Sequence, residues 1–301
     1  MEPAPTQEIR LPVLSRRRVE LHIRREDLLH PGLSGNKFRK LNYNLQQMQA
    51  AGLKTLVTFG GAYSNHIHAT AAAGKEFGFR TIGIIRGEEL DGRPLNPTLA
   101  DARAAGMELH FVSREAYARR GDPGFQVELL DRYGPAYLLP EGGTNREAIR
   151  GCAEILGPED AAFNWVCCPV GTGGTLAGLV AGSFPGQRIR GYSALKADDL
   201  SESLKALVPG DNWDLCTAFH FGGYARIDAS LVRFINQFFA DTGIPLDPVY
   251  TGKMLYGILD EVGRGTFEKG SRILAIHTGG LQGIRGMNLN LRKKNLPLLQ
   301  L

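Results

Sequence analysis

The sequence predicts an α/β protein with two lobes, each built on an open, mostly parallel sheet flanked by helices. Short apolar segments rich in β-branched residues alternate with longer segments of helical periodicity, as in parallel sheets covered by helices. Two such βα series follow each other, and a glycine-rich joint at 140–143 separates them. Ligands of open sheets bind beyond the carboxyl ends of the strands, so we expect the functional residues there.

The first βα series starts with a strand near 19–24 and a helix over 37–50, which Gly52 ends. Further strands are predicted at 55–59, 81–85, 108–112 and 136–139, and further helices at 64–77, 97–105 and 126–133.

The second series starts with a helix over 145–156 and a strand at 163–168, which runs into a glycine-rich loop and helix at 171–178. Its remaining strands are predicted at 188–193 and 272–277, and its remaining helices at 198–207, 229–242, 252–262 and 281–287.

The composition excludes several classes of protein. The net charge of +4 is small for 301 residues, and the basic clusters at 16–18 and 292–294 are too short to follow a phosphate backbone. No segment approaches the ~18 apolar residues of a membrane span. The four cysteines lack the paired spacing of a zinc site. We expect a cytoplasmic protein without metal, nucleic-acid or membrane partners.

A glycine-rich segment, GTGGTLAG at 171–178, follows a strand of buried character and opens a helix. Its main-chain amides and the positive end of the helix dipole favour an anion, most naturally a phosphate. The segment fits neither the P-loop pattern, which needs a lysine, nor the dinucleotide pattern, because Leu176 replaces the third glycine. A tight strand-to-helix turn without a ligand is an equally good interpretation of this segment alone.

A second segment, GGAYSNH at 60–66, lies between a predicted strand and a predicted helix. Ser64 and Asn65 are common helix caps, so a purely structural role is possible. Together with His66 they also present hydroxyl, amide and main-chain N–H groups to a substrate carboxylate.

Lys37 differs from the other lysines because Gly35 and Asn36 precede it in the segment SGNKFRKL at 34–41. A lysine behind such a turn can project inward, where burial disfavours its charged form and makes the amine a nucleophile towards an aldehyde. Lys40 and Lys54 lack this setting and are weaker candidates.

In this order the segments resemble the fold-type II pyridoxal-phosphate enzymes of the tryptophan synthase β superfamily, within it the 1-aminocyclopropane-1-carboxylate deaminase/D-cysteine desulfhydrase family. The motifs are SGNKFRKL, SNH, GTGGTLAG, DPVYTGK and HTGG, between Arg24 and Gly286. The resemblance implies a large domain that binds pyridoxal 5'-phosphate (1–42 and 145–301), a smaller substrate-side domain (43–144) and a homodimer.

The resemblance also implies roles for the matching residues. Lys37 holds the cofactor aldehyde covalently and moves protons at the substrate Cα. Asn65 contacts the cofactor's ring hydroxyl, and Ser64 and His66 face the substrate carboxylate. The cofactor phosphate is bound by the residues of the glycine-rich loop, Gly171, Thr172, Gly173, Gly174 and Thr175.

Four later residues complete the implied site. Tyr250 and Tyr224 match two active-site tyrosines, although core packing explains each of them equally simply. Thr278 matches the Ser/Thr that faces the pyridine nitrogen, and Thr251 stands on the substrate side where the deaminases have a glutamate. A neutral hydroxyl does not keep the pyridine nitrogen protonated, which favours elimination. This pattern is similar to that of the D-cysteine desulfhydrases.

The resemblance therefore implies elimination from a small amino acid, with D-cysteine giving pyruvate, ammonia and sulfide. Alternatives are an aminocyclopropanecarboxylate deaminase or another small-amino-acid deaminase or racemase of this fold, and, in a different class, a non-catalytic protein that binds a phosphometabolite. Tyr63 and the segment Ala225-Arg226-Ile227 depart from the family pattern beside the expected substrate position.

Overall fold

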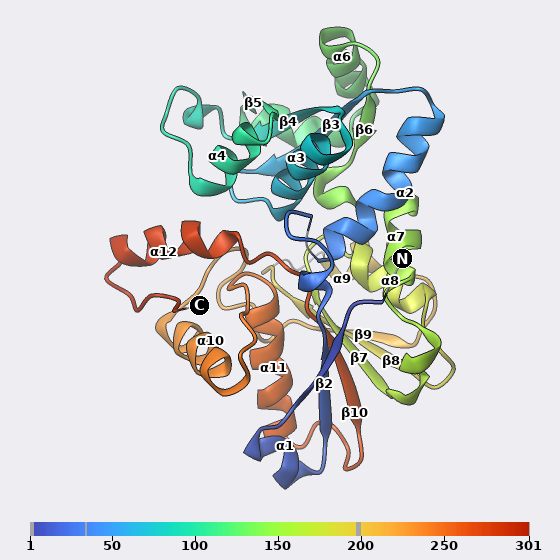
Figure 1. Ribbon diagram of the computed structural model, residues 1–301, viewed down its shortest axis with the longest axis vertical. Coiled ribbons are helices and arrows are strands. Elements are labelled where there is room, and N and C mark those ends of the chain that lie inside the picture. Colours follow the sequence, from blue (N-terminus) through green and yellow to red (C-terminus); the bar gives the residue numbers. More distant parts are fainter. Residues whose placement is uncertain (1–2, 34, 197–199, 301) are drawn as a thin grey trace.

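The computed structural model describes residues 3–33, 35–196 and 200–300. It has the expected α/β architecture, with two separate sheets flanked by helices (Figure 1). Ser34 of the lysine motif and the first two residues of the helix predicted at 198–207 lie outside the described residues. Within the described ranges, no helix is both long enough and apolar enough to cross a membrane.

The larger sheet has six strands in the order β1-β2-β10-β7-β8-β9. β1 pairs antiparallel with β2, and all the other neighbours are parallel. Their bounds are β1 Thr6–Ile9, β2 Glu20–Arg24, β7 Trp165–Val170, β8 Arg188–Ser193, β9 Trp213–Cys216 and β10 Arg272–Ile276.

The smaller sheet has four parallel strands in the order β5-β4-β3-β6. Their bounds are β3 Thr55–Gly61, β4 Arg80–Arg86, β5 Glu108–Val112 and β6 Tyr137–Leu139. The five inner residues of both β3 and β4 are buried, because helices cover both faces of the sheet. This explains why these strands are continuously apolar instead of alternating.

Twelve α-helices are found among the described residues. Their bounds are α1 Pro12–Arg17, α2 Asn36–Ala50, α3 Asn65–Phe77, α4 Pro97–Ala104, α5 Arg114–Ala118, α6 Pro123–Tyr133, α7 Arg146–Ala153, α8 Gly174–Ala181, α9 Leu200–Leu207, α10 Ala229–Thr242, α11 Thr251–Arg264 and α12 Gly283–Lys293. Asparagine side chains cap the N-termini of α4 and α7, which fixes where these helices begin.

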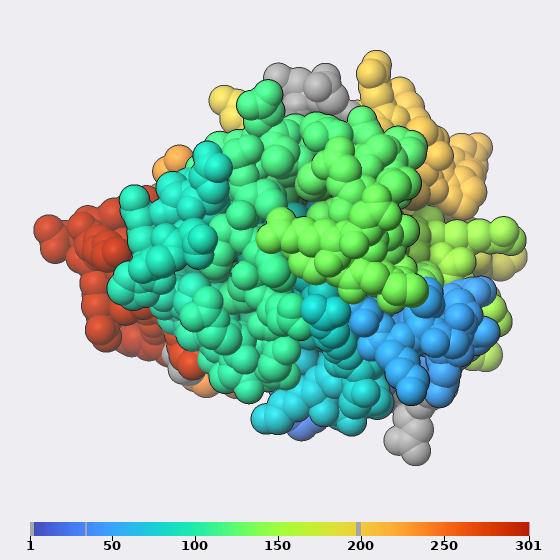
Figure 2. Space-filling model, turned by 90° about the horizontal axis from the view of Figure 1, so that it is seen from above, coloured from blue at the N-terminus to red at the C-terminus, as the bar shows by residue number. Residues whose placement is uncertain are grey.

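The two lobes are stacked, and α2 passes between them (Figure 1). Seen from above, the smaller lobe covers most of the face, and the red C-terminal segment extends beyond it at one side (Figure 2). The backbones of α2 and α7 touch, since a Cβ atom at Gly151 would lie 2.0 Å from the carbonyl oxygen of Arg39. This helix pair therefore joins the start of the smaller lobe to the start of the second series.

The sequence prediction missed four short elements: β1, α1, α5 and β9. β1 has the sequence TQEI and contributes one buried residue, and no residue of β9 is fully buried. Such edge strands carry little of the apolar pattern on which the prediction rests. The predicted helix at 145–156 ends earlier, at Ala153, and the one predicted at 281–287 extends to Lys293.

All four strands of the smaller sheet fall within the predicted 43–144 domain. The predicted boundary between residues 42 and 43, however, falls inside α2 instead of in a linker. The chain therefore leaves the large lobe along a continuous helix.

A buried ion pair fixes α2 on the larger lobe. The Arg39 guanidinium donates two hydrogen bonds of 2.9 Å to the Glu26 carboxylate, and both side chains are almost fully buried. We expect Arg39→Met to lower the free energy of unfolding by about 3–5 kcal/mol, because it leaves a buried carboxylate unpaired. Urea denaturation measures this change.

The matched control is Arg80→Met, which breaks an exposed pair with Glu108. That pair is accessible to water, so its loss should cost at most about 1 kcal/mol. Equal effects of the two substitutions would contradict the role given to the buried pair.

Candidate active site

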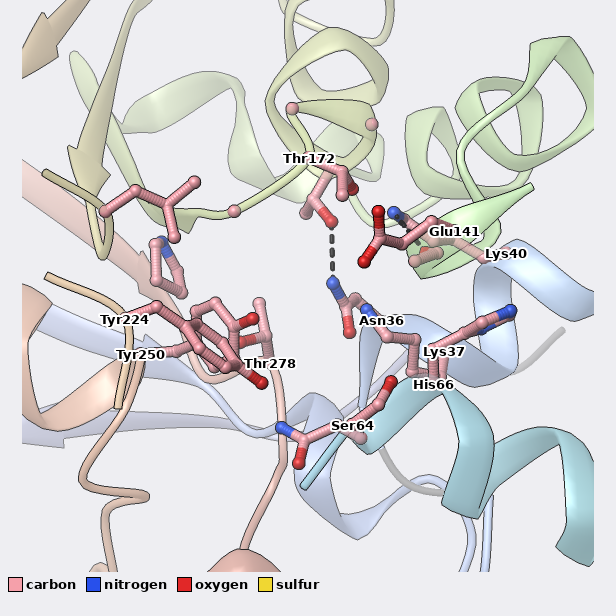
Figure 3. Close-up of a pocket in the computed structure, with 18 of the residues that line it drawn as sticks. Asn36, Lys37, Lys40, Ser64, His66, Glu141, Thr172, Tyr224, Tyr250 and Thr278 are labelled. Carbon is pink, nitrogen blue, oxygen red and sulfur yellow. Dashed lines mark hydrogen bonds between the residues drawn. The ribbon is translucent and has the colours of Figure 1, made fainter. Parts of the chain in front are cut away.

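A cavity of about 300 Å³ lies between the two sheets. Residues at the carboxyl ends of β3, β4, β7 and β10 line it, as expected for open parallel sheets. The labelled side chains lie around it, with Lys37 and His66 on the side opposite Tyr224, Tyr250 and Thr278 (Figure 3). Twelve of the thirteen predicted site residues line it: Lys37, Ser64, Asn65, His66, Gly171, Thr172, Gly173, Gly174, Thr175, Tyr224, Tyr250 and Thr278.

Lys37 lies in the first turn of α2, and its side chain faces the cavity. Among the described residues its amine has no hydrogen-bond or ion-pair partner. The surrounding protein withdraws the amine from bulk water and lowers its pKa to about 7, and the positive charge of Lys40 contributes to this shift. An appreciable fraction of the amine is therefore neutral, and nucleophilic, near pH 7.

A backbone contact brings Lys37 to Thr278. Gly35 precedes α2 with φ of 74°, and a Cβ atom there would lie 1.9 Å from the carbonyl oxygen of Thr278. The main-chain N–H of Asn36 donates to the same carbonyl, at 3.4 Å. Because no other residue type fits position 35, glycine is required to join the lysine helix to the end of β10.

The glycine-rich loop forms one wall of the cavity and leads into α8. Gly173 has φ of 85°, and α8 begins at the next residue, so its N-terminus and dipole face the cavity. The Asn36 amide donates to the Thr175 hydroxyl at 2.7 Å, and the hydroxyls of Thr144 and Thr172 are 2.6 Å apart. These bonds hold the loop in place without occupying its main-chain amides.

Lys40 lies directly behind this loop. Its amine donates to the carbonyl oxygen of Gly142 at 3.0 Å and to the hydroxyl of Thr144 at 2.9 Å. A Cβ atom at Gly174 would lie 2.9 Å from the same amine, so glycine at this position lets the Lys40 amine approach the loop closely. A positive charge therefore lies beside the loop at the point where the sequence predicts an anion.

Ser64 caps α3 by accepting a hydrogen bond from the main-chain N–H of Ile67 at 3.3 Å, and its own O–H stays available as a donor. The carbonyl oxygen of the Asn65 side chain accepts from Gln282 at 2.6 Å, which leaves the NH2 group of Asn65 as the donor. The structural and the functional interpretations of this segment are thus compatible. The structural bonds use oxygen atoms of Ser64 and Asn65 as acceptors, and the Ser64 O–H and the Asn65 NH2 group remain available to donate to a ligand.

The ring of His66 has a defined tautomer. The Thr58 hydroxyl donates to the carbonyl oxygen of Leu139, so it accepts from His66 Nε2–H, at 2.8 Å. Burial, together with the charges of Lys37 and Lys40, holds the pKa of His66 well below its ordinary value. Nδ1 is a buried acceptor without a partner among the described residues. The neutral ring therefore has no N–H left for the substrate carboxylate that the sequence assigned to it.

Tyr224 and Tyr250 lie together, with ring centroids 6.2 Å apart. Burial raises the pKa of both phenols, so both are protonated at neutral pH. The Tyr250 phenol donates to the Tyr224 phenol, which leaves the Tyr224 proton for the cavity. A Cβ atom at Gly171 would lie 3.1 Å from the Tyr250 ring, which packs against the glycine-rich loop.

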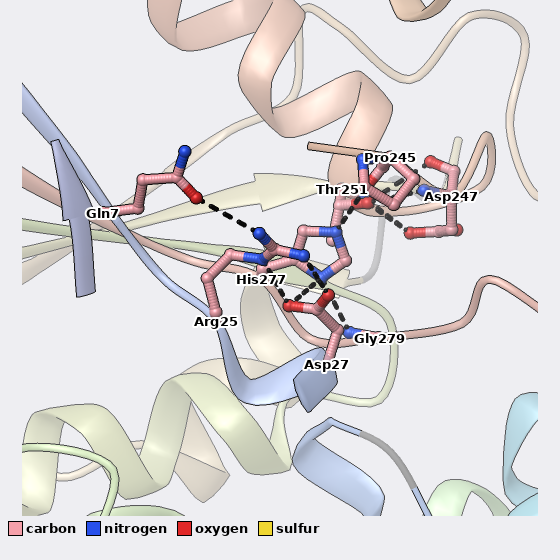
Figure 4. A network of polar contacts seen from close by, with 8 residues as sticks. All are labelled: Gln7, Arg25, Asp27, Pro245, Asp247, Thr251, His277 and Gly279. Atoms are coloured by element: carbon pink, nitrogen blue, oxygen red, sulfur yellow. Dashed lines mark hydrogen bonds and ion pairs between the residues drawn. The ribbon is translucent and has the colours of Figure 1, made fainter. Parts of the chain in front are cut away.

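The structure separates the two threonines on which the sequence interpretation relied. Thr278 lines the cavity, whereas Thr251 does not. Thr251 is the first residue of α11, and its hydroxyl donates to the Asp247 carboxylate at 2.7 Å. Both residues belong to the polar network shown in Figure 4. Thr251 is fully buried, so the predicted contact with substrate is replaced by a structural one.

The donor set fits pyridoxal phosphate. A partly neutral amine, a loop of free main-chain amides at a helix N-terminus and two protonated phenols surround one cavity. Glycines 171 and 174 leave room where any Cβ atom would meet Tyr250 or Lys40. Such a site can hold a phosphorylated aldehyde by its phosphate and present its aldehyde carbon to Lys37.

The sequence prediction left four polar side chains of the cavity without a role: Asn36, Lys40, Arg86 and Glu141. Lys40 is three residues after Lys37 on the same helix, and this i,i+3 spacing is the signal that could have identified it. Arg86 ends β4, and Glu141 follows β6, both at the carboxyl edge of the smaller sheet. Their position at strand ends was visible in the predicted pattern.

Fold and site define a fold-type II pyridoxal-phosphate enzyme, and comparisons with known proteins agree. The family model described as pyridoxal-phosphate dependent enzyme matches residues 1–279, so this chain belongs to that family. Membership sets aside the non-catalytic binding protein that was considered from the sequence.

Two relatives and two solved structures give the closer context. A mitochondrial bifunctional D-cysteine desulfhydrase/1-aminocyclopropane-1-carboxylate deaminase of Arabidopsis thaliana is 33% identical over 94% of this chain and 77% of its own length. A D-cysteine desulfhydrase of Yersinia pestis is 30% identical over 87% and 86%. The crystal structure of an ACC deaminase homologue superposes with a TM-score of 0.84 at 29% identity, covering 97% and 94%. An O-ureido-L-serine synthase, at 16% identity and a TM-score of 0.69, covers 93% and 90% and shares the fold.

The contact at position 35 is tested by Gly35→Ala. We expect a clear loss of stability and of cofactor binding, because the new Cβ atom collides with Thr278 and moves Lys37. Gly52→Ala is the matched control, since Gly52 also has positive φ but nothing within 4 Å of its Cβ position, and should cost roughly 1–2 kcal/mol of strain alone. Equal losses in thermal unfolding and cofactor titration would contradict this role.

The pKa of Lys37 is tested by the rate at which the cofactor-free protein takes up pyridoxal phosphate. The amine must lose its proton, so the rate should rise with pH through about 7 and then level off. An absorbance band at ~410–430 nm follows the reaction and should be absent in Lys37→Ala.

Lys40→Met removes a like charge and should move the midpoint of this pH profile upward. Lys54→Met, at an exposed position outside the cavity, is the control and should leave the midpoint in place. If the pH profile of the unmodified protein had its midpoint near the pKa of an ordinary lysine, the Lys37 amine would not be desolvated.

Proposed function

We propose that this pyridoxal-phosphate dependent lyase removes the β-substituent from a small D-amino acid, D-cysteine foremost, and releases pyruvate, ammonia and sulfide. The relatives named D-cysteine desulfhydrase support this choice. Within the site, the proposal rests on one observation: among the described residues that line the cavity, no carboxylate is without a hydrogen-bond or ion-pair partner.

Glu141 is the one acidic side chain among the described residues that line the cavity. The Tyr117 hydroxyl donates to it at 2.8 Å, and Arg120 forms an ion pair with its other oxygen, also at 2.8 Å. Thr278 contributes only a neutral hydroxyl. No carboxylate of this lining is thus free to keep the pyridine nitrogen of the cofactor protonated, which favours a reaction in which the electron pair leaves with a β-substituent.

When bound, pyridoxal phosphate supplies an aldehyde for the substrate amine and a ring system that withdraws electrons from Cα. Lys37 is the base: its amine, with a pKa of about 7, takes the Cα proton and can return it. The loop at 171–175 and the N-terminus of α8 bind the phosphate. The Ser64 hydroxyl and the N-terminus of α3 receive the substrate carboxylate. On the opposite side the Tyr224 phenol, held by Tyr250, donates a hydrogen bond.

The reaction of D-cysteine balances without an oxidant or reductant. The proton on Cα passes to Lys37, and the Cβ–S bond breaks with its electron pair going to sulfur. One water molecule is consumed as the remaining three-carbon unit becomes pyruvate and ammonia.

The second candidate is the opening of the aminocyclopropanecarboxylate ring, which the names of the Arabidopsis relative and of the ACC deaminase homologue suggest. The pair Tyr224 and Tyr250 supports it, because a protonated phenol backed by a second one could deliver a proton to a ring carbon. We also propose that the enzyme is a homodimer and acts in the cytoplasm. The four cysteines are all free thiols, as expected in a reducing compartment. Analytical ultracentrifugation would measure the oligomeric state.

A substrate profile decides between the two candidates. Pyruvate and sulfide would be measured with the purified, cofactor-loaded protein on D-cysteine, L-cysteine, D-serine, β-chloro-D-alanine and aminocyclopropanecarboxylate. We expect D-cysteine and β-chloro-D-alanine to react fastest, since both carry good leaving groups at Cβ. Dominant formation of 2-oxobutanoate from aminocyclopropanecarboxylate would overturn the proposal and favour the deaminase.

A further inference from the structure

Arg86 stands at the carboxyl edge of the smaller sheet and lines the cavity, yet the proposed reaction gives it no task. It is the last residue of β4 and pairs in register with Gly61, the last residue of β3. A Cβ atom at Gly61 would lie 3.6 Å from the Arg86 guanidinium, so the arginine passes close over that glycine. Ser64 follows three residues after Gly61, which places Arg86 on the substrate side of the cavity.

No protein group in the described ranges pairs with the charge of Arg86, whose side chain is exposed to the solvent of the cavity mouth. Among the described residues its guanidinium forms no hydrogen bond and no ion pair, and its aromatic contact is the Tyr117 ring, 5.7 Å from the centroid. The nearby carboxylate of Glu141 is already bound by Tyr117 and Arg120. The guanidinium also influences Tyr224, because its charge opposes the burial that raises the pKa of that phenol.

The other cationic and donor groups of the cavity all have assigned tasks. Lys37 is reserved for the cofactor aldehyde and the Cα proton. Lys40 donates to Gly142 and Thr144 behind the phosphate loop. The N-termini of α8 and α3 receive the two anions that every substrate complex contains, the cofactor phosphate and the α-carboxylate. Arg86 therefore remains as a donor for a third anion.

Resting on the proposed function, we propose that Arg86 contacts the β-substituent of the substrate and favours substrates in which this group carries negative charge or acquires it on leaving. A guanidinium binds phosphate, sulfate or carboxylate through two parallel N–H···O bonds, which a neutral hydroxyl cannot match. With D-cysteine the same charge stabilises the departing sulfide anion. Arg86 is then the residue that determines which leaving group the lyase prefers.

The matched probes are O-phospho-D-serine and D-serine, which share one carbon skeleton. Elimination from the phosphorylated substrate moves the Cα proton to Lys37 and breaks the Cβ–O bond with its electron pair going to phosphate. One water molecule is consumed, and pyruvate, ammonia and inorganic phosphate are released. The ratio of kcat/KM for the two substrates measures the preference for the charged group.

We expect the unmodified holoenzyme to prefer O-phospho-D-serine, and Arg86→Gln to lower the ratio about 10- to 100-fold, as for the loss of a charged hydrogen-bond partner. Arg86→Lys keeps the positive charge but cannot donate two parallel hydrogen bonds, so it should lower the ratio less than Arg86→Gln does. Arg93→Gln, at an exposed position outside the cavity, is the control and should keep the ratio.

Two outcomes would overturn the inference. Equal losses with both substrates in Arg86→Gln would mean that Arg86 binds the α-carboxylate, and an unchanged kcat/KM for both would mean that it is only a surface charge. If neither substrate yields pyruvate, the proposed elimination is wrong, but the role of Arg86 can still be tested separately. The inference is then judged by titrating the cofactor absorbance with the two compounds, where Arg86→Gln must weaken binding of the phosphorylated one selectively.

Discussion

The close approach of two main-chain segments, Gly35 before α2 and Thr278 after β10, is the constraint on which the site depends. With a Cβ position only 1.9 Å from the Thr278 carbonyl oxygen, the chain can pass there only as glycine. The contact joins residues that are far apart in the sequence and sets Lys37 and Thr278 in the same cavity. The lysine is thus positioned by backbone packing, before any cofactor contributes.

The electrostatics of the cavity follow from the same packing. Enclosure between the lobes removes Lys37 from bulk water, and Lys40 adds a like charge, so the lysine becomes a usable base and nucleophile near neutral pH. Among the described lining residues, Lys37, Lys40 and Arg86 outnumber the single carboxylate, Glu141. A surplus of positive charge suits a cofactor phosphate and an amino-acid carboxylate, and it leaves one cation for the substrate's side chain.

The glycines of the phosphate loop and the serine and asparagine of the SNH segment show how one residue can serve both fold and site. Ser64 uses a lone pair to cap α3 and keeps its proton for a ligand. The loop threonines are held by Asn36 and Thr144, so the main-chain amides stay free. Thr251 is the opposite case, because its hydroxyl is fully committed to Asp247 and belongs to the fold alone.

The sequence by itself determined the α/β class, most helices and strands, the family and the cofactor, because buried parallel strands are continuously apolar and glycine-rich turns carry strict local requirements. It also identified twelve cavity residues, since each belongs to a short motif and most of these motifs follow the carboxyl end of a strand. Only the tertiary structure decided that Thr251 lies outside the cavity, that the His66 ring has no N–H to offer, and that Arg86 has no partner among the described residues. Those facts depend on which partners a side chain meets across elements distant in sequence, and no local pattern encodes that.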